Sequence, residues 1–144
     1  MEIRWEKTFD SAHRLWQHSE KCRFLHGHTY KVKVKAIGDL NKWGMVADFG
    51  DLKELIVNLL DHKIILFRDD PIVEGLKKLD QRIILLDRNP TAENLAIFIA
   101  SRLIEKLKLD SVEVEVFETP TQSGFCRMDK ENFIKVNFEE ISPL

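Results

Sequence analysis

The sequence lacks most features of secreted and membrane-spanning proteins. It contains only two cysteines in 144 residues, too few for a disulfide framework. It has no apolar run of transmembrane length, and its first residues lack the basic and apolar regions of a signal peptide. A reduced, cytoplasmic protein is therefore expected, with a Cys22–Cys126 bridge as the alternative.

The charged residues leave little net charge. Asp and Glu number 24 against 22 Lys and Arg, which gives a formal net charge of −2. This balance gives no reason to expect nucleic acid or an anionic membrane as a partner. Internal repeats, linkers and low-complexity stretches are also missing from the sequence. We therefore expect one domain that spans residues 1–144.

Several segments alternate between apolar and polar residues, which is the period of a β-strand. The clearest one places His26, His28 and Tyr30 on one face and Lys31, with two further lysines, on the other. Strands are expected at residues 2–15, 26–37, 112–118 and 133–138.

Two segments between these strands have apolar residues at helical spacing. Asp48 precedes the first and Thr91 the second, and both residue types are favoured N-caps. The connection at residues 63–89 contains a short apolar run, Ile83–Leu86, that can form a buried strand. The order strand–strand–helix–helix–strand–strand predicts an α+β domain, a four-stranded antiparallel sheet with two helices on one face.

The strongest local sign of chemistry is His26-Gly27-His28. Residues two apart in a strand point the same way, so both imidazoles can bind one ion. Catalytic zinc sites have three protein ligands and one open position, and histidine is a favoured ligand. His13 is the leading third ligand because it lies at the end of the neighbouring strand. A His-x-His pair also arises by chance, and His18, in a polar loop, is interpreted as solvated.

Three residues outside this group could supply acid–base chemistry. Cys22 lies four residues before His26, where a thiol can be a ligand, a small buried hydrophobe or a reactive thiolate. Asp61 and His62 follow the first helix, and a carboxylate can orient a histidine base. An Asp-His pair also commonly just ends a helix.

Glu118 closes the apolar face of the strand at residues 112–118. A carboxylate on such a face requires a partner. Two kinds of partner fit this position, a structural arginine and a ligand that offers two adjacent N–H donors.

Several motifs together resemble the 6-pyruvoyl-tetrahydropterin synthase family, which includes 6-carboxytetrahydropterin synthase. They are FDSAHRL at 9–15, CRFLHGH at 22–28, MVADF at 45–49, LDHK at 60–63, PTAENL at 90–95 and FET at 117–119. The motifs occur in the family's order and cover most of the chain. The resemblance implies the T-fold, with subunits that close into trimeric barrels and two barrels that stack into a homohexamer.

The resemblance also implies a role for each candidate residue. The ligands of a Zn2+ ion would be His13, His26 and His28. The catalytic residues would be Cys22, Asp61 and His62, the last two from a neighbouring subunit. The pterin-binding residues would be Glu118, Thr91 and Glu93.

The implied substrate is 7,8-dihydroneopterin triphosphate. The short spacing between Cys22 and His26 is similar to the branch that forms 6-carboxy-5,6,7,8-tetrahydropterin for queuosine, so we expect a zinc-dependent lyase with this product. Two alternatives stay open, a 6-pyruvoyl product from the same site and a non-catalytic pterin-binding homologue. A third branch, which serves folate synthesis, places Glu where the thiol would be, and Cys22 disfavours it.

Further expectations concern charged side chains. Lys31, Lys33 and Lys35 form a solvated strand face or, if the sheet closes into a barrel, line its lumen and meet Glu113 and Glu115. Arg127 is expected to meet the triphosphate. Residues 69–82 and 120–124 match no motif.

Overall fold

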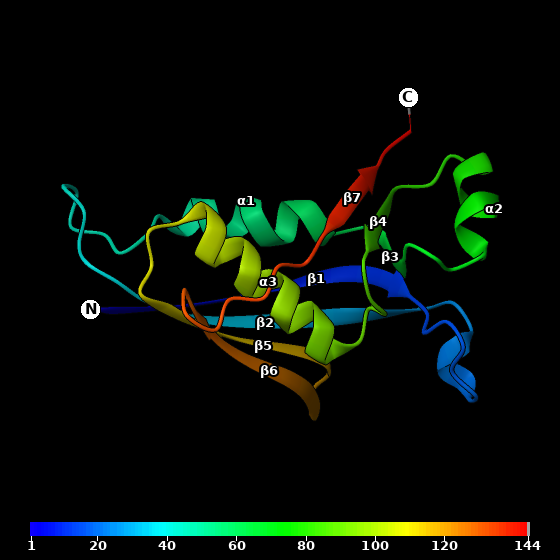
Figure 1. The fold of residues 1–144 in the computed structure, drawn as a ribbon, viewed down its shortest axis with the longest axis horizontal. Helices are drawn as coiled ribbons and strands as arrows, with labels where there is room; N and C mark the ends of the chain where they lie inside the picture. The colour runs from blue at the N-terminus through cyan, green and yellow to red at the C-terminus, as the bar shows by residue number, and fades with distance from the viewer. Residues whose placement is uncertain (144) are drawn as a thin grey trace.

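The computed structural model describes residues 1–143 and contains one seven-stranded sheet (Figure 1). The strands are β1 Glu2–His13, β2 His26–Ile37, β3 Ile64–Phe67, β4 Ile83–Leu86, β5 Ser111–Thr119, β6 Gln122–Asp129 and β7 Phe138–Ile141. The helices are α1 Phe49–Leu60, α2 Ile72–Lys78 and α3 Ala92–Lys106, with a short 3-10 helix, η1, at Lys21–Arg23. In space the strands follow the order β6-β5-β2-β1-β3-β4-β7.

The expected α+β class is confirmed, but the four-stranded antiparallel sheet with two helices is wrong in detail. The connection between α1 and α3 contains β3, α2 and β4, and β3 is parallel to both β1 and β4. The final strand pair also differs, because β6 begins at Gln122 and residues 133–137 have no regular structure. Of the expected strand at residues 133–138, only Phe138 belongs to a strand, β7.

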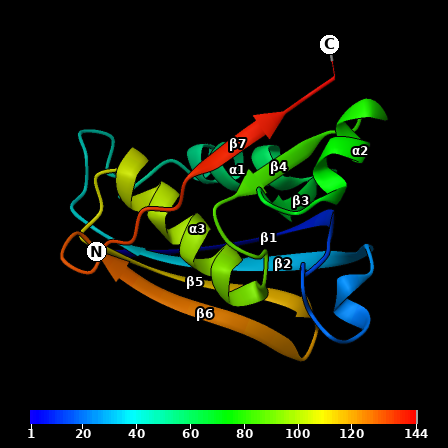
Figure 2. The same cartoon turned by 45° about the vertical axis from the view of Figure 1, so that its right-hand side comes forward.

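Two of the helices cover one face of the sheet. α1 packs against β1, and α3 packs against β5 and β6 (Figures 1 and 2). Both begin at the expected caps: Asp48 Oδ1 accepts a hydrogen bond from Gly50 N at 2.7 Å, and Thr91 Oγ1 accepts one from Asn94 N at 3.0 Å. The main core lies between this face and the helices and includes Tyr30, Val32, Val34, Val112, Val114, Val116, Leu52, Ile56, Leu95 and Phe98.

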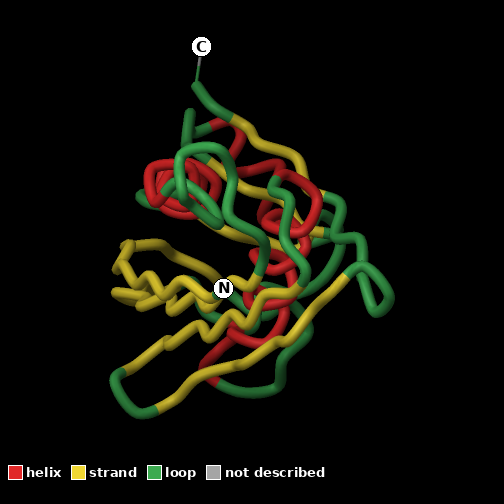
Figure 3. The backbone as a smooth tube through the Cα atoms, turned by 90° about the vertical axis from the view of Figure 1, so that its left-hand side faces the viewer, coloured by secondary structure: helices red, strands yellow, loops and turns green. Residues whose placement is uncertain are grey.

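The three short strands form an extension of the sheet with its own small core. Beyond β1 the sheet continues with β3, β4 and β7. Figure 3 shows strands of the sheet reaching towards the C-terminus. The buried residues of this second cluster are Leu66, Val73, Ile83 and Leu85. β3 and β4 are four-residue apolar runs, which do not identify their secondary structure by periodicity, and β7 contains two glutamates, so only β4 was expected.

β6 packs tightly against the first turn of α3 at Gly124. A Cβ atom at Gly124 would lie 2.6 Å from the nitrogen of Glu93 and 2.7 Å from the carbonyl carbon of Ala92. Only glycine fits at this distance. The segment at residues 120–124, which matched no motif, therefore ends in a residue that sets where α3 begins.

The opposite face of the sheet is charged. Lys33 pairs in register with Glu115 and Lys35 with Glu113, and Lys35 Nζ lies 3.4 Å from Glu113 Oε2. The expected meeting of these lysines and glutamates thus occurs within one chain. Within residues 1–143, no helix is long and apolar enough to span a membrane.

Candidate active site

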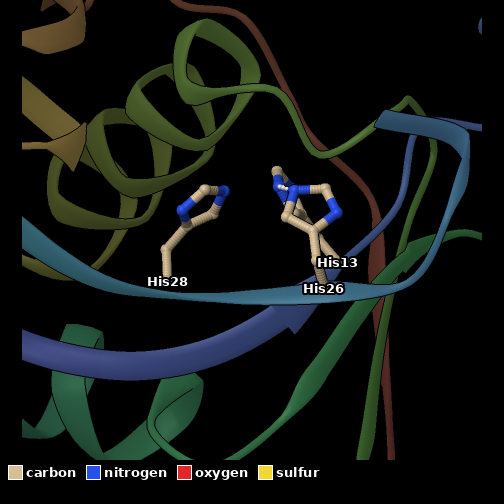
Figure 4. A group of neighbouring side chains, drawn as sticks. All are labelled: His13, His26 and His28. Carbon is tan, nitrogen blue, oxygen red and sulfur yellow. Dashed lines mark hydrogen bonds between the residues drawn. The ribbon is translucent and has the colours of Figure 1, made fainter. Parts of the chain in front are cut away.

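Three histidines meet where β1 ends and β2 begins. His13 and His26 are cross-strand partners, and His28 lies two residues further along β2 (Figure 4). Their candidate ligand nitrogens all lie within 4.8 Å of one another, so the group could hold one metal ion. His13 is the most enclosed of the three, with 2% of its surface exposed.

The hydrogen bonds of His13 and His26 fix which nitrogens face the centre of the group. His13 Nδ1 lies 2.7 Å from the carbonyl oxygen of Pro90, and His26 Nδ1 lies 2.7 Å from that of Phe24. A carbonyl can only accept, so each neutral ring carries its proton on Nδ1 and a lone pair on Nε2. Such backbone partners are typical of metal-ligating histidines.

The Nε2 atoms of His13 and His26 carry no proton and face each other. The Nε2 atoms of His13 and His26 are 3.1 Å apart, and His28 Nε2 is buried with no hydrogen-bond partner within residues 1–143. Two lone pairs at this distance repel, and a buried unpaired nitrogen costs about 1–3 kcal/mol. A cation bound between the rings removes both penalties, so the residues fit a metal.

Burial keeps these rings in the form that binds metal. Burial lowers the pKa of His13 to about 4, opposed by its bond to Pro90 and aided by His26 and His28. Burial also lowers the pKa of His28, with Glu118 acting in the opposite direction. Both rings are therefore neutral near pH 7, as ligation requires.

Cys22 lies in η1, near the metal-binding end of β2. Its carbonyl oxygen accepts a hydrogen bond from Leu15 N at 2.8 Å, and its side chain is half-buried. The thiol is not part of the group of metal-ligand atoms, which within residues 1–143 contains only the histidines.

Asp61 and His62 form a hydrogen-bonded pair held against β1. Asp61 Oδ1 accepts from Asp10 N at 2.8 Å, and the nitrogen of His62 donates to the Asp10 carbonyl at 2.7 Å. Asp61 Oδ2 lies 2.9 Å from His62 Nδ1, which leaves His62 Nε2 free. The Asp10 amide, followed by His62, lowers the pKa of Asp61 below its usual range, so the carboxylate is charged.

The backbone and exposure of His62 set it apart from the metal group. It has a left-handed φ of 58°, uncommon outside glycine and often found at functional sites. Its side chain is 70% exposed and lines a groove of about 790 Å³ whose walls also include Asp10, Thr29 and His28 of the metal group. Asp10 and Thr29 alternate with the histidine positions of β1 and β2 and therefore point to the other face.

The expected pterin-binding residues lie at the end of β5 and at the start of α3. Glu118 is near enough to His28 and Tyr30 for its charge to raise the pKa of both. Thr91 caps α3 directly after Pro90, whose carbonyl holds His13, and Glu93 is exposed in the first turn.

Arg127 lies elsewhere. It is the register partner of Glu113 on β6, and its Nε donates to Glu113 Oε1 at 2.9 Å on the charged face of the sheet. The structure therefore does not bring Arg127 to the histidines of the same chain.

Some contributors to the site carry no sequence signal. The carbonyls of Pro90 and Phe24 orient two histidines, and any residue type could supply such a group. Tyr30 is fully buried beside the histidines, and its hydroxyl has no partner within residues 1–143. Burial, and secondly Glu118, raises the pKa of that hydroxyl, which keeps it protonated.

Known proteins are similar to this chain over most of its sequence. The family described as 6-pyruvoyl tetrahydropterin synthase matches residues 2–129. A protein of Haemophilus influenzae named 6-carboxy-5,6,7,8-tetrahydropterin synthase is 40% identical, over 84% of this chain and 93% of its own. One of Pyrococcus horikoshii, named as putative 6-carboxy-5,6,7,8-tetrahydropterin synthase, is 38% identical over 82% and 84%.

Solved structures of 6-pyruvoyl tetrahydropterin synthases are also similar. The Plasmodium falciparum protein superposes with a TM-score of 0.66 at 25% identity, covering 90% of this chain and 98% of its own. The Caenorhabditis elegans protein gives a TM-score of 0.59 at 27% identity, covering 90% and 96%. On its sequence and its fold, the chain belongs to the 6-pyruvoyl tetrahydropterin synthase family.

Proposed function

We propose that the protein is a zinc-dependent lyase that converts 7,8-dihydroneopterin triphosphate to 6-carboxy-5,6,7,8-tetrahydropterin. The observation that carries this proposal is the group of His13, His26 and His28, whose free nitrogens converge on one point. Tetrahedral zinc with Zn–N bonds of about 2.0–2.1 Å separates its nitrogens by about 3.3 Å. The 3.1 Å between the Nε2 atoms of His13 and His26 is close to this value.

The side chains around the histidines have complementary tasks. When bound, zinc would supply Lewis acidity that makes the side-chain hydroxyls and the adjoining C–H groups of the pterin more acidic. The Cys22 thiolate would then accept a proton from a side-chain carbon, and His62, oriented by Asp61, would act as the second acid–base group. Glu118 would accept hydrogen bonds from the 2-amino pyrimidine edge, with Thr91 and Glu93 lining the pocket.

We also propose that the active protein is a homohexamer built from two trimeric barrels. Within residues 1–143, β1 pairs with β3 only at Ala12 and His13, and Asp10 is bonded to Asp61 and His62, so the outer edge of residues 2–8 is unpaired. β6 lies at the end of the sheet with its own free edge. Pairing β6 of one copy with β1 of the next would close a ring. Contact between copies would also explain how an exposed His62 reaches a neighbouring metal group.

Mass spectrometry of the pterin product tests the proposed reaction. Zinc-loaded protein is incubated with 7,8-dihydroneopterin triphosphate, and a 6-carboxy product with released acetaldehyde is expected. A 6-pyruvoyl product would instead assign the activity for which the Plasmodium and Caenorhabditis proteins are named. Absence of any product would support a non-catalytic pterin-binding protein.

A cysteine variant tests the assignment of roles within the site. Cys22→Ala is expected to abolish turnover while the zinc content stays unchanged, because the thiol is not part of the histidine group. Cys126→Ala, at the other free cysteine, is the matched control and should retain activity. Loss of zinc in Cys22→Ala would instead make the thiol a ligand.

A further inference from the structure

A buried ion pair joins the metal-binding end of β1 to the segment at residues 69–82, which matched no motif. Arg14 directly follows His13, and its Nε donates to Asp70 Oδ2 at 2.7 Å while Nη2 donates to Oδ1. The Asp70 side chain is 0% exposed and that of Arg14 19%. A two-bond fork of this kind fixes the orientation of the guanidinium as well as its position.

The same guanidinium reaches the segment that contains Cys22. Arg14 Nη1 donates to the carbonyl oxygen of Arg23 at 3.4 Å, and Leu15 N donates to the carbonyl oxygen of Cys22 at 2.8 Å. Two successive residues after β1 therefore hold two successive carbonyls of η1.

Little else holds this short helix in place. Within η1 no residue is buried, and its N-cap, Glu20, makes no side-chain capping bond. An apolar groove of about 630 Å³, lined by Phe24, Leu25 and Leu76 among others, separates the η1 segment from α2. Both elements lie at the same end of the molecule (Figure 2). The position of the thiol thus depends on hydrogen bonds rather than on a core.

Asp70 is itself rigidly placed. Its Oδ1 accepts from Ile72 N at 2.9 Å, and its own nitrogen donates to the Phe67 carbonyl at 3.0 Å. α2 follows at once and buries Val73 in the second core cluster. The carboxylate that Arg14 meets is therefore fixed by hydrogen bonds of its own turn rather than by the Val73 contact.

We propose that Asp70, acting through Arg14, is a positioning residue for the Cys22 thiol. The inference rests on the proposed function, in which this thiol moves a proton of the substrate. It gives the segment at residues 69–82 a role: the segment holds the base at the correct distance from the metal-bound side chain. Neither residue needs to touch the substrate.

The test compares Asp70→Asn with Val73→Ala. Asparagine keeps the size of the side chain and an oxygen for Ile72 N, but loses the charge that orients Arg14. Val73→Ala loosens the same helix through its core and leaves the ion pair intact. Both variants are assayed well below their melting temperatures, so that loss of folded protein does not affect the measured kcat or alkylation rate.

Asp70→Asn is expected to lower kcat by about 10- to 100-fold with unchanged KM, because a misplaced base affects only the chemical step. The rate of Cys22 alkylation by iodoacetamide, followed by peptide mass spectrometry, should rise, while that of Cys126 and the zinc content stay constant. Val73→Ala should change neither kcat nor the alkylation rate. If Asp70→Asn does not fold, Arg14→Lys replaces it, since lysine keeps the charge but loses the fork to Asp70 and the bond to the Arg23 carbonyl.

Equal loss of kcat in Asp70→Asn and Val73→Ala would overturn the proposal, because the effect would then be one of stability. Unchanged alkylation of Cys22 in Asp70→Asn would also overturn it. The alkylation measurement needs no turnover. It therefore decides the positioning of the thiol even if the wild-type protein proves inactive on the pterin, which would refute the proposed function separately.

Discussion

The contact at Gly124 allows a quantitative prediction for Gly124→Ala. The new Cβ would lie 2.6 Å from the Glu93 nitrogen, where ordinary contact begins at 3.4 Å. β6 and α3 must therefore separate by about 0.8 Å, and overpacking of this kind costs about 1–3 kcal/mol. Reduced entropy of the unfolded chain returns about 0.4–1 kcal/mol. The net loss, about 1–2 kcal/mol, corresponds to a fall in Tm of about 3–7 °C for a chain of 144 residues.

Thermal unfolding followed by circular dichroism measures this effect, at equal protomer concentration because assembly contributes to stability. Gly75→Ala is the matched control. It lies in α2 with no heavy atom within 4 Å of a new Cβ, and alanine is favoured over glycine in a helix by up to about 1 kcal/mol. A Gly124→Ala protein as stable as the wild type would refute the close packing of β6 on α3. The displaced α3 should also carry Pro90 away from His13 and weaken zinc binding.

Three further predictions concern the metal group and the charged face. His28→Ala removes a ligand and should weaken zinc binding, as measured by competition with a chelating dye. The loss should exceed the factor of about 10 to 100 that is typical when a hydrogen-bond partner of a ligand is removed. Because the folded-state pKa of His13 is about 4, below its ordinary 6.5, metal-free protein should lose stability as the pH falls from 6.5 to 4. Denaturant titrations should show less of this loss in His13→Asn, and an identical slope would contradict the assignment. Lys33→Glu places a third carboxylate beside Glu6 and Glu115 and should weaken assembly, so an unchanged mass by light scattering would argue against the barrel.

Local patterns predicted the parts of the fold that local physics determines. β2 was expected with its observed bounds, since alternation over twelve residues fits only a strand. Both helix starts were found through their caps. β6 was missed because Gln122 and Ser123 are polar, and because glycine occupies the inward position against α3. Glycine is required at this position by a tertiary contact, which leaves no periodic signal in the sequence.

In the candidate site too, local patterns identified some residues and missed others. His26 and His28 were recognised together because a strand places them on one face, and His13 because strand pairing brings it beside them. The Arg14–Asp70 pair joins residues 56 positions apart and depends on α2, whose place in the fold no motif indicated. Long-range pairs of this kind become visible only when the chain is folded.

The free edge of β1 affects how the subunit behaves before it assembles. Residues 2–8 expose a row of backbone N–H and C=O groups, which can template pairing with an extended polypeptide. Glu2, Arg4 and Glu6 restrict that pairing to strands of matching charge. An unassembled subunit would therefore be prone to pair with the wrong strand, and the yield of native protein would depend on how fast its copies find one another.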